Sequence, residues 1–112
     1  MAYYRRSRVW IQGKPAGILC ETEDGYQFSY LPEYLEDEAA VAVSLTMPLS
    51  ENAYESKVLM PFFDGLIPEG WLLDVVVRNW KINYNDRFGL LLVSCMDCIG
   101  DVSIEEVQNE DR

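Results

Sequence analysis

The stretch RVWIQGKPAGILCET, residues 8–22, decides the fold of the first part of the chain. Its two flanks, 8–12 and 16–22, favour β-branched or aromatic residues and surround a Gly-Lys-Pro turn, which is the pattern of a β-hairpin. A second turn at 23–25 leads into 26–30, where aromatic and polar residues alternate as on a half-buried strand. The first thirty residues therefore predict a three-stranded meander.

The middle of the chain has weaker signals. A proline-led stretch at 31–35 predicts a short helix or turn. Residues 40–47 resemble another strand, and 48–57 is polar without a clear period, as in an exposed loop.

The pattern becomes helical beyond residue 60. We expect a short helix at 62–66, a longer one from Pro68 or Glu69 to Trp80, and a third at about 87–96. Cys98-Ile99-Gly100 predicts a turn, 101–107 a closing strand and 108–112 a polar tail.

Strands, then helices, then a strand indicate an α+β fold. We expect a single domain over 1–112, ordered from about residue 6 to residue 107. Its core would be a small antiparallel sheet or partial barrel, formed by the N-terminal meander and the C-terminal strand and packed with two or three short helices.

The charge of the chain narrows the class of partner. Nineteen acidic and nine basic residues give a formal net charge of −10, which repels phosphate backbones and favours a basic protein over nucleic acid. Arg5, Arg6 and Arg8 are the local exception. They form either a solvated lead-in to the first strand or a functional basic patch.

The sequence also bears on location. The N-terminus lacks the apolar run of a signal peptide, and no stretch approaches the ~18 apolar residues of a membrane-spanning helix. We expect a cytoplasmic protein with no membrane partner and, from the odd number of cysteines, no disulfide framework.

Few residues could carry catalytic chemistry. The chain has no histidine, the commonest general base and zinc ligand, and it lacks the phosphate-binding and catalytic motifs of kinases. Cys95 and Cys98 have C-x-x-C spacing, which fits either a metal or redox pair or two buried small side chains. We expect no enzyme activity, no cofactor and no metal.

The segment 61–71 is the most unusual part of the chain, because two prolines, two glycines and three aromatic residues restrict its backbone. The segment fits a rigid connector that fills the core of the protein with Phe62, Phe63 and Leu66. A helix from Glu69 onward would place Trp71 on its polar side, where the indole is either an interface anchor or covered by the 48–57 loop. The same helix has Asp74, Val75 and Arg78 beside Trp71 and a core face of Leu72, Leu73, Val76 and Trp80.

Four stretches together resemble a known family. VWIQGKPAGIL (9–19), SLTMPL (44–49), FFDGLIPEG (62–70) and DCIGDVSI (97–104) are similar, in this order, to signature stretches of the N-terminal domain of HipA-type serine/threonine kinase toxins. In that family a kinase core follows the domain. A chain made of this domain alone looks like HipS, the small member of tripartite HipBST toxin–antitoxin modules.

The resemblance implies a function. In HipBST modules HipT carries the kinase, HipB binds DNA, and the small subunit neutralises the kinase. The resemblance therefore implies an antitoxin that binds a HipT-like kinase, with a HipB-like protein as a further partner in a ternary complex.

Combined with the helical wheel, this implies a partner-binding surface in which Trp71 and Ile67 fill a kinase pocket and acidic side chains face basic residues. The expected surface comprises Phe63, Asp64, Ile67, Pro68, Glu69, Trp71, Asp74, Val75 and Arg78.

Two other readings remain open at this point. The chain could be a scaffold that docks on the kinase away from its active site and links it to the DNA-binding protein. It could also complete a split kinase, although no nucleotide-binding motif supports that reading.

Overall fold

The computed structural model describes residues 5–67, 70–83, 85–94 and 102–107, without the side chains of residues 70–72, 76 and 94. The predicted turn at 98–100, the polar tail at 108–112 and the cysteines Cys95 and Cys98 lie outside the described residues.

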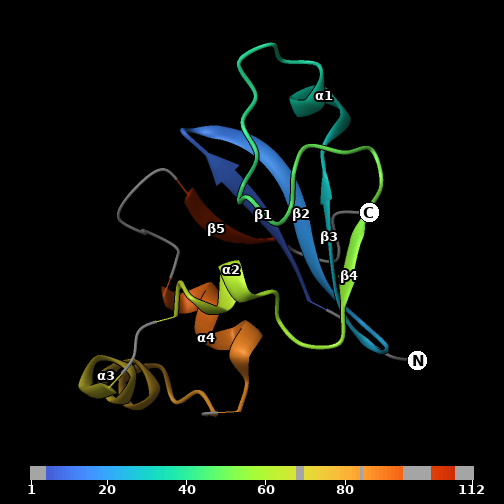
Figure 1. The fold of residues 1–112 in the computed structure, drawn as a ribbon. Coiled ribbons are helices and arrows are strands. Elements are labelled where there is room, and N and C mark those ends of the chain that lie inside the picture. Colours follow the sequence, from blue (N-terminus) through green and yellow to red (C-terminus); the bar gives the residue numbers. More distant parts are fainter. Residues whose placement is uncertain (1–4, 68–69, 84, 95–101, 108–112) are drawn as a thin grey trace.

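A five-stranded antiparallel sheet forms the framework (Figure 1). Its strands are β1 (Arg6–Ile11), β2 (Lys14–Thr22), β3 (Gly25–Tyr30), β4 (Tyr54–Ser56) and β5 (Val102–Val107). Their spatial order is β4-β3-β2-β1-β5, so the predicted meander forms the centre and the predicted closing strand pairs with β1. With the helices described below, this confirms the predicted α+β class.

The first hairpin forms as predicted, but its turn lies at 12–13 and not at 13–15, because Lys14 and Pro15 already belong to β2. Ile11 pairs with Lys14, which leaves Gln12 and Gly13 as a two-residue loop. Both have positive φ, 53° and 79°, as a turn of the I′ type needs to match the twist of the flanking strands. Glycine adopts this conformation without strain at the second position.

One face of the sheet forms the core and the other meets solvent. Val9, Leu19, Phe28 and Ile104 are fully or almost fully buried and come from four neighbouring strands. On the opposite face, Trp10 Nε1 donates to a carboxylate oxygen of β5 at 3.2 Å. The alternation along the strands therefore fixes which side receives the helices.

The four described helices are α1 (Pro32–Leu35), α2 (Pro61–Asp64), α3 (Gly70–Trp80) and α4 (Arg87–Ser94). Proline begins both α1 and α2, where its missing N–H has no intrahelical partner to lose. Figure 1 shows α1 at one end of the sheet and α2, α3 and α4 grouped at the other. Helix α4 contributes four buried apolar side chains to the core, those of Phe88, Leu90, Leu91 and Leu92.

The prediction of a strand at 40–47 is wrong. Its only β pairing is an isolated bridge between Ser44 and Met47, and tyrosine hydroxyls from the sheet and α1 bind its backbone instead. Tyr30 Oη donates to the carbonyl of Met47 and accepts from Val43 N at 2.9 Å. We call residues 41–47 the tyrosine-held loop.

Tyr34 holds the beginning of the same loop. Its hydroxyl donates to the carbonyl of Val41 at 2.8 Å and accepts from the amide of Val41 at 3.0 Å. The Tyr30 and Tyr34 rings lie nearly parallel, with centroids 6.2 Å apart. Side-chain hydroxyls thus replace the strand ladder that the sequence pattern suggests.

The prediction of a loop over 48–57 is wrong for residues 54–56. These form β4, in which Tyr54 pairs with Phe28 and Ser56 with Tyr26. Three residues carry too little alternation to be recognised from sequence. Pairing with the edge of β3, a tertiary interaction, determines the strand.

Candidate partner-binding surface on helix α3

The connector at 61–67 is anchored in the core of this chain. Phe63 is fully buried, and its ring centroid lies 5.4 Å from that of Phe28 on β3. Ile67 is 4% exposed. The assignment of these two residues to a partner-binding surface is therefore wrong, because their side chains are packed against their own subunit. The alternative expectation, that Phe63 belongs to the core, is confirmed.

Asp64 has a charged partner within the chain. Arg87 Nε, at the start of α4, donates to Asp64 Oδ1 at 2.8 Å. The Asp64 side chain is 42% exposed. Its main observed role is to connect the end of α2 to the start of α4, so the predicted contact with a basic partner would compete with an existing ion pair.

Helix α3 has one face toward the core and one toward solvent. Leu73 and Val77, one turn apart, pack against the core. Val75 is 36% exposed and Arg78 is exposed, whereas Asp74 is partly buried. The predicted solvent-facing position of Val75 and Arg78 is confirmed.

The expected placement of Trp80 on the core face is wrong. Its side chain is 54% exposed, although it lies only one turn beyond the core-facing Val77. Trp80 is the last residue of α3, and Lys81 already has a positive φ of 54°. The indole therefore stands at the end of the helix, where it is more than half exposed.

The remaining expected contact residues are only partly described. Pro68 and Glu69 lie outside the described residues, as does the side chain of Trp71. The backbone of Trp71 belongs to α3, four residues before Val75 and seven before Arg78. Residues at these spacings share one face of a helix, so the helical period predicts that position 71 lies on the side of Val75 and Arg78. The role of the indole stays a prediction.

Arg5 connects strand β2 with the start of α4. Its Nη2 lies 2.9 Å from Glu21 Oε2 and 2.7 Å from Asp86 Oδ1, and its guanidinium lies 5.3 Å from the ring centroid of Phe88. Neither the solvated lead-in nor the functional basic patch describes this residue. Arg5 is a structural contact between β2 and the start of α4, a role that a charge cluster in sequence does not reveal.

These ion pairs shift the pKa values of both acids. Hydrogen bonds from the Arg5 guanidinium lower the pKa of Glu21 and that of Asp86, and burial opposes the shift in each case. Burial raises the pKa of the Cys20 thiol on β2, which keeps this cysteine in its unreactive form at neutral pH.

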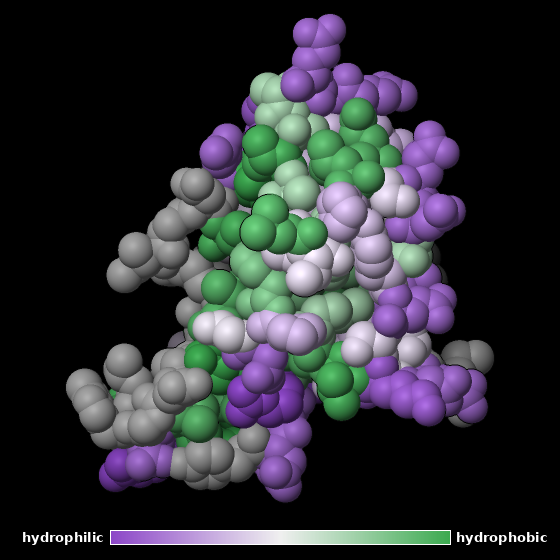
Figure 2. Space-filling view, in the orientation of Figure 1, coloured by the Kyte–Doolittle hydropathy of each residue, from purple (hydrophilic) through white to green (hydrophobic). Residues whose placement is uncertain are grey.

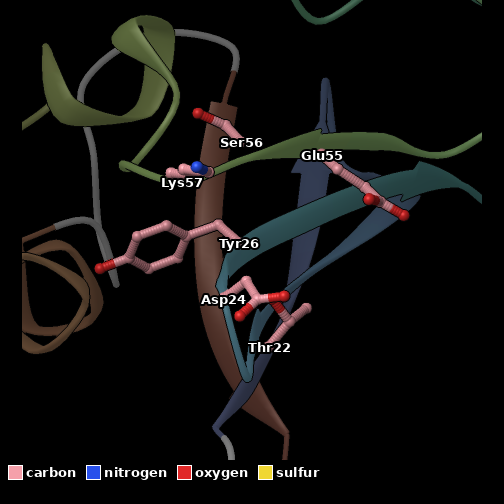
Figure 3. A pocket seen from close by; sticks show the side chains of 6 residues that line it. All are labelled: Thr22, Asp24, Tyr26, Glu55, Ser56 and Lys57. Atoms are coloured by element: carbon pink, nitrogen blue, oxygen red, sulfur yellow. The ribbon is translucent and has the colours of Figure 1, made fainter.

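A hollow lies beside the β2–β3 turn. It has a volume of about 270 Å³ and is lined by Thr22, Asp24, Tyr26, Glu55, Ser56 and Lys57. Figure 3 shows the Tyr26 ring and the Glu55 carboxylate extending in opposite directions, so the ionisable groups do not converge on one point. The described residues contain no group of three or more side chains placed to hold a metal ion.

No described helix has the length and apolar character needed to cross a membrane.

Comparisons with known proteins agree over most of the chain. The family described as the HipA N-terminal domain matches residues 7–105. A solved structure, the N-terminal domain of HipA toxin, superposes with a TM-score of 0.75 at 27% identity, covering 97% of this chain and 98% of that one.

Relatives of two sizes contain this domain. An uncharacterised protein of Haemophilus influenzae is 33% identical over 102 residues, which cover 91% of this chain and 92% of the relative. Two proposed kinases of Sinorhizobium fredii, Y4dM and Y4mE, are 28% and 27% identical, and the match covers only 27% and 20% of their lengths. The chain belongs to the HipA N-terminal domain family and is a HipA-related component of a toxin–antitoxin system.

Proposed function

We propose that this chain is a cytoplasmic, non-enzymatic antitoxin of the HipS type, which binds a HipT-like serine/threonine kinase and inhibits it. The family match and the structural similarity to the N-terminal domain of HipA toxin support this proposal. So do the proposed kinases in which a similar domain occupies only part of a longer chain. A domain that is covalently joined to a kinase in one protein is a natural partner for a separate kinase in another.

The solvent-facing side of α3 is the surface that best supports binding. Val75 and Arg78 are exposed there, and their spacing from position 71 along the helix supports a shared face. Trp and Arg are enriched among residues that dominate protein interfaces. We infer that Trp71 is the anchor, that Val75 extends the apolar contact and that Arg78 lies at the rim. Phe63 and Ile67 support the surface from within.

The principal experiment compares two tryptophans of the same helix. Trp71→Ala should weaken binding to the kinase of the same module by at least about 30-fold, because an interface tryptophan typically contributes ~2 kcal/mol or more. Trp80→Ala is the matched control, since Trp80 is exposed but lies outside the proposed face. Binding is measured by calorimetry, and circular dichroism checks that both variants keep the wild-type fold.

Equal losses for the two variants, or no loss for Trp71→Ala, would contradict the proposed surface. The antitoxin role is tested separately by phosphotransfer from ATP with increasing amounts of the wild-type chain. Inhibition in proportion to occupancy supports an antitoxin, whereas binding without inhibition indicates a scaffold that links the kinase to a HipB-like protein. A rise in activity would indicate a split kinase.

A further inference from the structure

The tyrosine-held loop presents an exposed apolar side chain on a fixed backbone. Leu45 lies at its apex and is 100% exposed. The turn beneath it is closed by a hydrogen bond from Met47 N to the Ser44 carbonyl at 3.2 Å. Tyr30 binds the backbone on both sides of the apex, through Val43 and Met47. The backbone that carries Leu45 is therefore preorganised, so it loses little conformational entropy when the loop binds a partner.

Two further exposed apolar side chains lie near Leu45 in the sequence. Val41 is 44% and Leu49 39% exposed, and both lie close to Leu45 along the chain. Figure 2 shows hydrophobic residues gathered on the upper part of this face, with hydrophilic residues around its margin. An apolar centre with a polar rim is the usual composition of a protein-binding surface. We call Val41, Leu45 and Leu49 the apolar patch.

A cavity of about 350 Å³ lies between α1 and the chain that follows the apolar patch. Tyr30, Pro32 and Leu35 provide apolar walls, and Glu36 and Glu51 provide carboxylates from the two sides. Within the part of the chain that the structure describes, neither carboxylate has an ion-pair partner. Their neighbour Asp37, in contrast, is paired with Lys14 at 2.8 Å.

Apolar walls beside two unpaired carboxylates suit one kind of side chain. Arginine and lysine place an aliphatic stem along apolar surface while their charged ends stay near water and acidic groups. We propose that this cavity and the apolar patch form a second docking surface, which binds a protein segment carrying an arginine or lysine next to a larger apolar residue. The basic side chain enters the cavity between Glu36 and Glu51, and the apolar one contacts Leu45 and Leu49.

Charge argues against a second copy of this chain as the occupant. The chain carries a net charge of −10, and two copies meeting through surfaces that each contain Glu36 and Glu51 would repel one another. A basic segment of another protein is attracted by the same field. Because α1 and α3 lie at opposite ends of the sheet in Figure 1, this surface and the proposed kinase-binding face can be occupied together.

The test uses short peptides and the full-length chain. Acetyl-Leu-Arg-Leu-amide is titrated into ¹⁵N-labelled protein at up to roughly 10 mM, a range suited to weak binding. We expect saturable shifts of the backbone amides at 35–36, 44–46 and 51. The same peptide with citrulline in place of arginine keeps the shape but not the charge, and it should bind at least about threefold more weakly.

Variants locate the binding. Glu36→Gln combined with Glu51→Gln should remove the difference between the arginine and citrulline peptides, and Leu45→Ser should weaken both peptides. Glu23→Gln is the matched control, because Glu23 is exposed in the turn at the far end of β3 and should leave binding unchanged. The amide spectrum of each variant checks the fold.

Several results would overturn the proposal. One is a set of amide shifts that spreads over acidic residues without saturating, which would indicate general charge attraction. Others are an absence of shifts, equal binding of the two peptides, or self-association of the chain through Leu45. None of these outcomes bears on the effect of Trp71→Ala, so the two binding surfaces can fail independently.

Discussion

The two ends of the sheet are closed by different chemistry. At the α1 end, the uncharged hydroxyls of Tyr30 and Tyr34 hold a loop. At the opposite end, the Arg5 guanidinium connects Glu21 with Asp86 at the start of α4. We call the first the tyrosine end and the second the ionic end. The first arrangement does not change charge across the physiological pH range, whereas the second depends on two ionised acids. The two ends of one small domain should therefore respond differently to mutation and to acid.

The largest expected effect comes from the core beneath the ionic end. Phe88 is fully buried against Tyr26, and Arg5 lies over its ring. Phe88→Ala should lower the free energy of unfolding by about 3–5 kcal/mol, because it removes buried area and leaves a cavity. Urea denaturation at pH 7 measures this loss. Val58→Ala, at a site 68% exposed, should change stability by less than about 0.5 kcal/mol.

The tyrosine end is tested by removing one hydroxyl. Tyr30→Phe should cost about 1–3 kcal/mol, because the Val43 amide and the Met47 carbonyl lose a buried partner while the ring still fits. Tyr54→Phe is the matched control. Its hydroxyl donates to the Pro48 carbonyl in an exposed position, where water can replace it. An equal loss in both variants would contradict the importance of burial at this end.

Removing the charge at the ionic end should have a smaller effect. Arg5→Gln should lower the free energy of unfolding at pH 7 by about 1–2 kcal/mol, because both acid side chains lose their partner but remain partly hydrated. Thermal unfolding followed by circular dichroism measures the change. The difference in stability between the wild type and Arg5→Gln should shrink in high salt, because salt screens partly exposed ion pairs.

The smallest effect is the dependence of stability on acid. Arg5 lowers the pKa values of Glu21 and Asp86 in the folded state, so their stabilisation is complete above their unfolded pKa values, about pH 5 and higher. It is lost as the pH falls through the lower, folded-state pKa values. Between pH 7 and pH 3 the wild type should therefore lose about 1 kcal/mol more than Arg5→Gln.

Arg8→Gln controls for the general removal of positive charge. Arg8 lies 3.7 Å from Glu105 on the exposed face of the sheet, and both side chains are largely hydrated. This variant should keep the acid dependence of the wild type. If it lost that dependence as fully as Arg5→Gln, the response would belong to net charge and not to the Arg5 contacts.

The sequence predicted the elements whose signals are local. β-branched and aromatic residues around a turn predicted β1 and β2, alternation predicted β3, and 101–107 was predicted as the closing strand that forms β5. A proline-led stretch predicted α1, and the helical pattern beyond residue 60 predicted α2, which begins at Pro61 and ends at Asp64 instead of covering 62–66. The tyrosine-held loop was mistaken for a strand because alternating apolar residues do not show whether a neighbouring strand is present. The short β4 was missed because pairing with β3 determines it.

The candidate surface was predictable only in part. The helical period placed Val75 and Arg78 toward solvent correctly. It could not show that Ile67 fills the core, because the chain direction between α2 and α3 is a tertiary property. It also placed Trp80 in the core, because a helical wheel does not show how far the end of a helix lies from the sheet.

The pairing of β1 with β5 has a consequence for synthesis of the protein. Trp10 and Glu105, which are hydrogen-bonded across these two strands, are 95 positions apart in the chain. At roughly 5–20 residues per second, a ribosome exposes one edge of β1 for about 5–20 seconds before its neighbour emerges. During that interval the nascent meander offers unpaired backbone groups to any extended segment nearby, so translation speed sets how long each new molecule is open to mispairing.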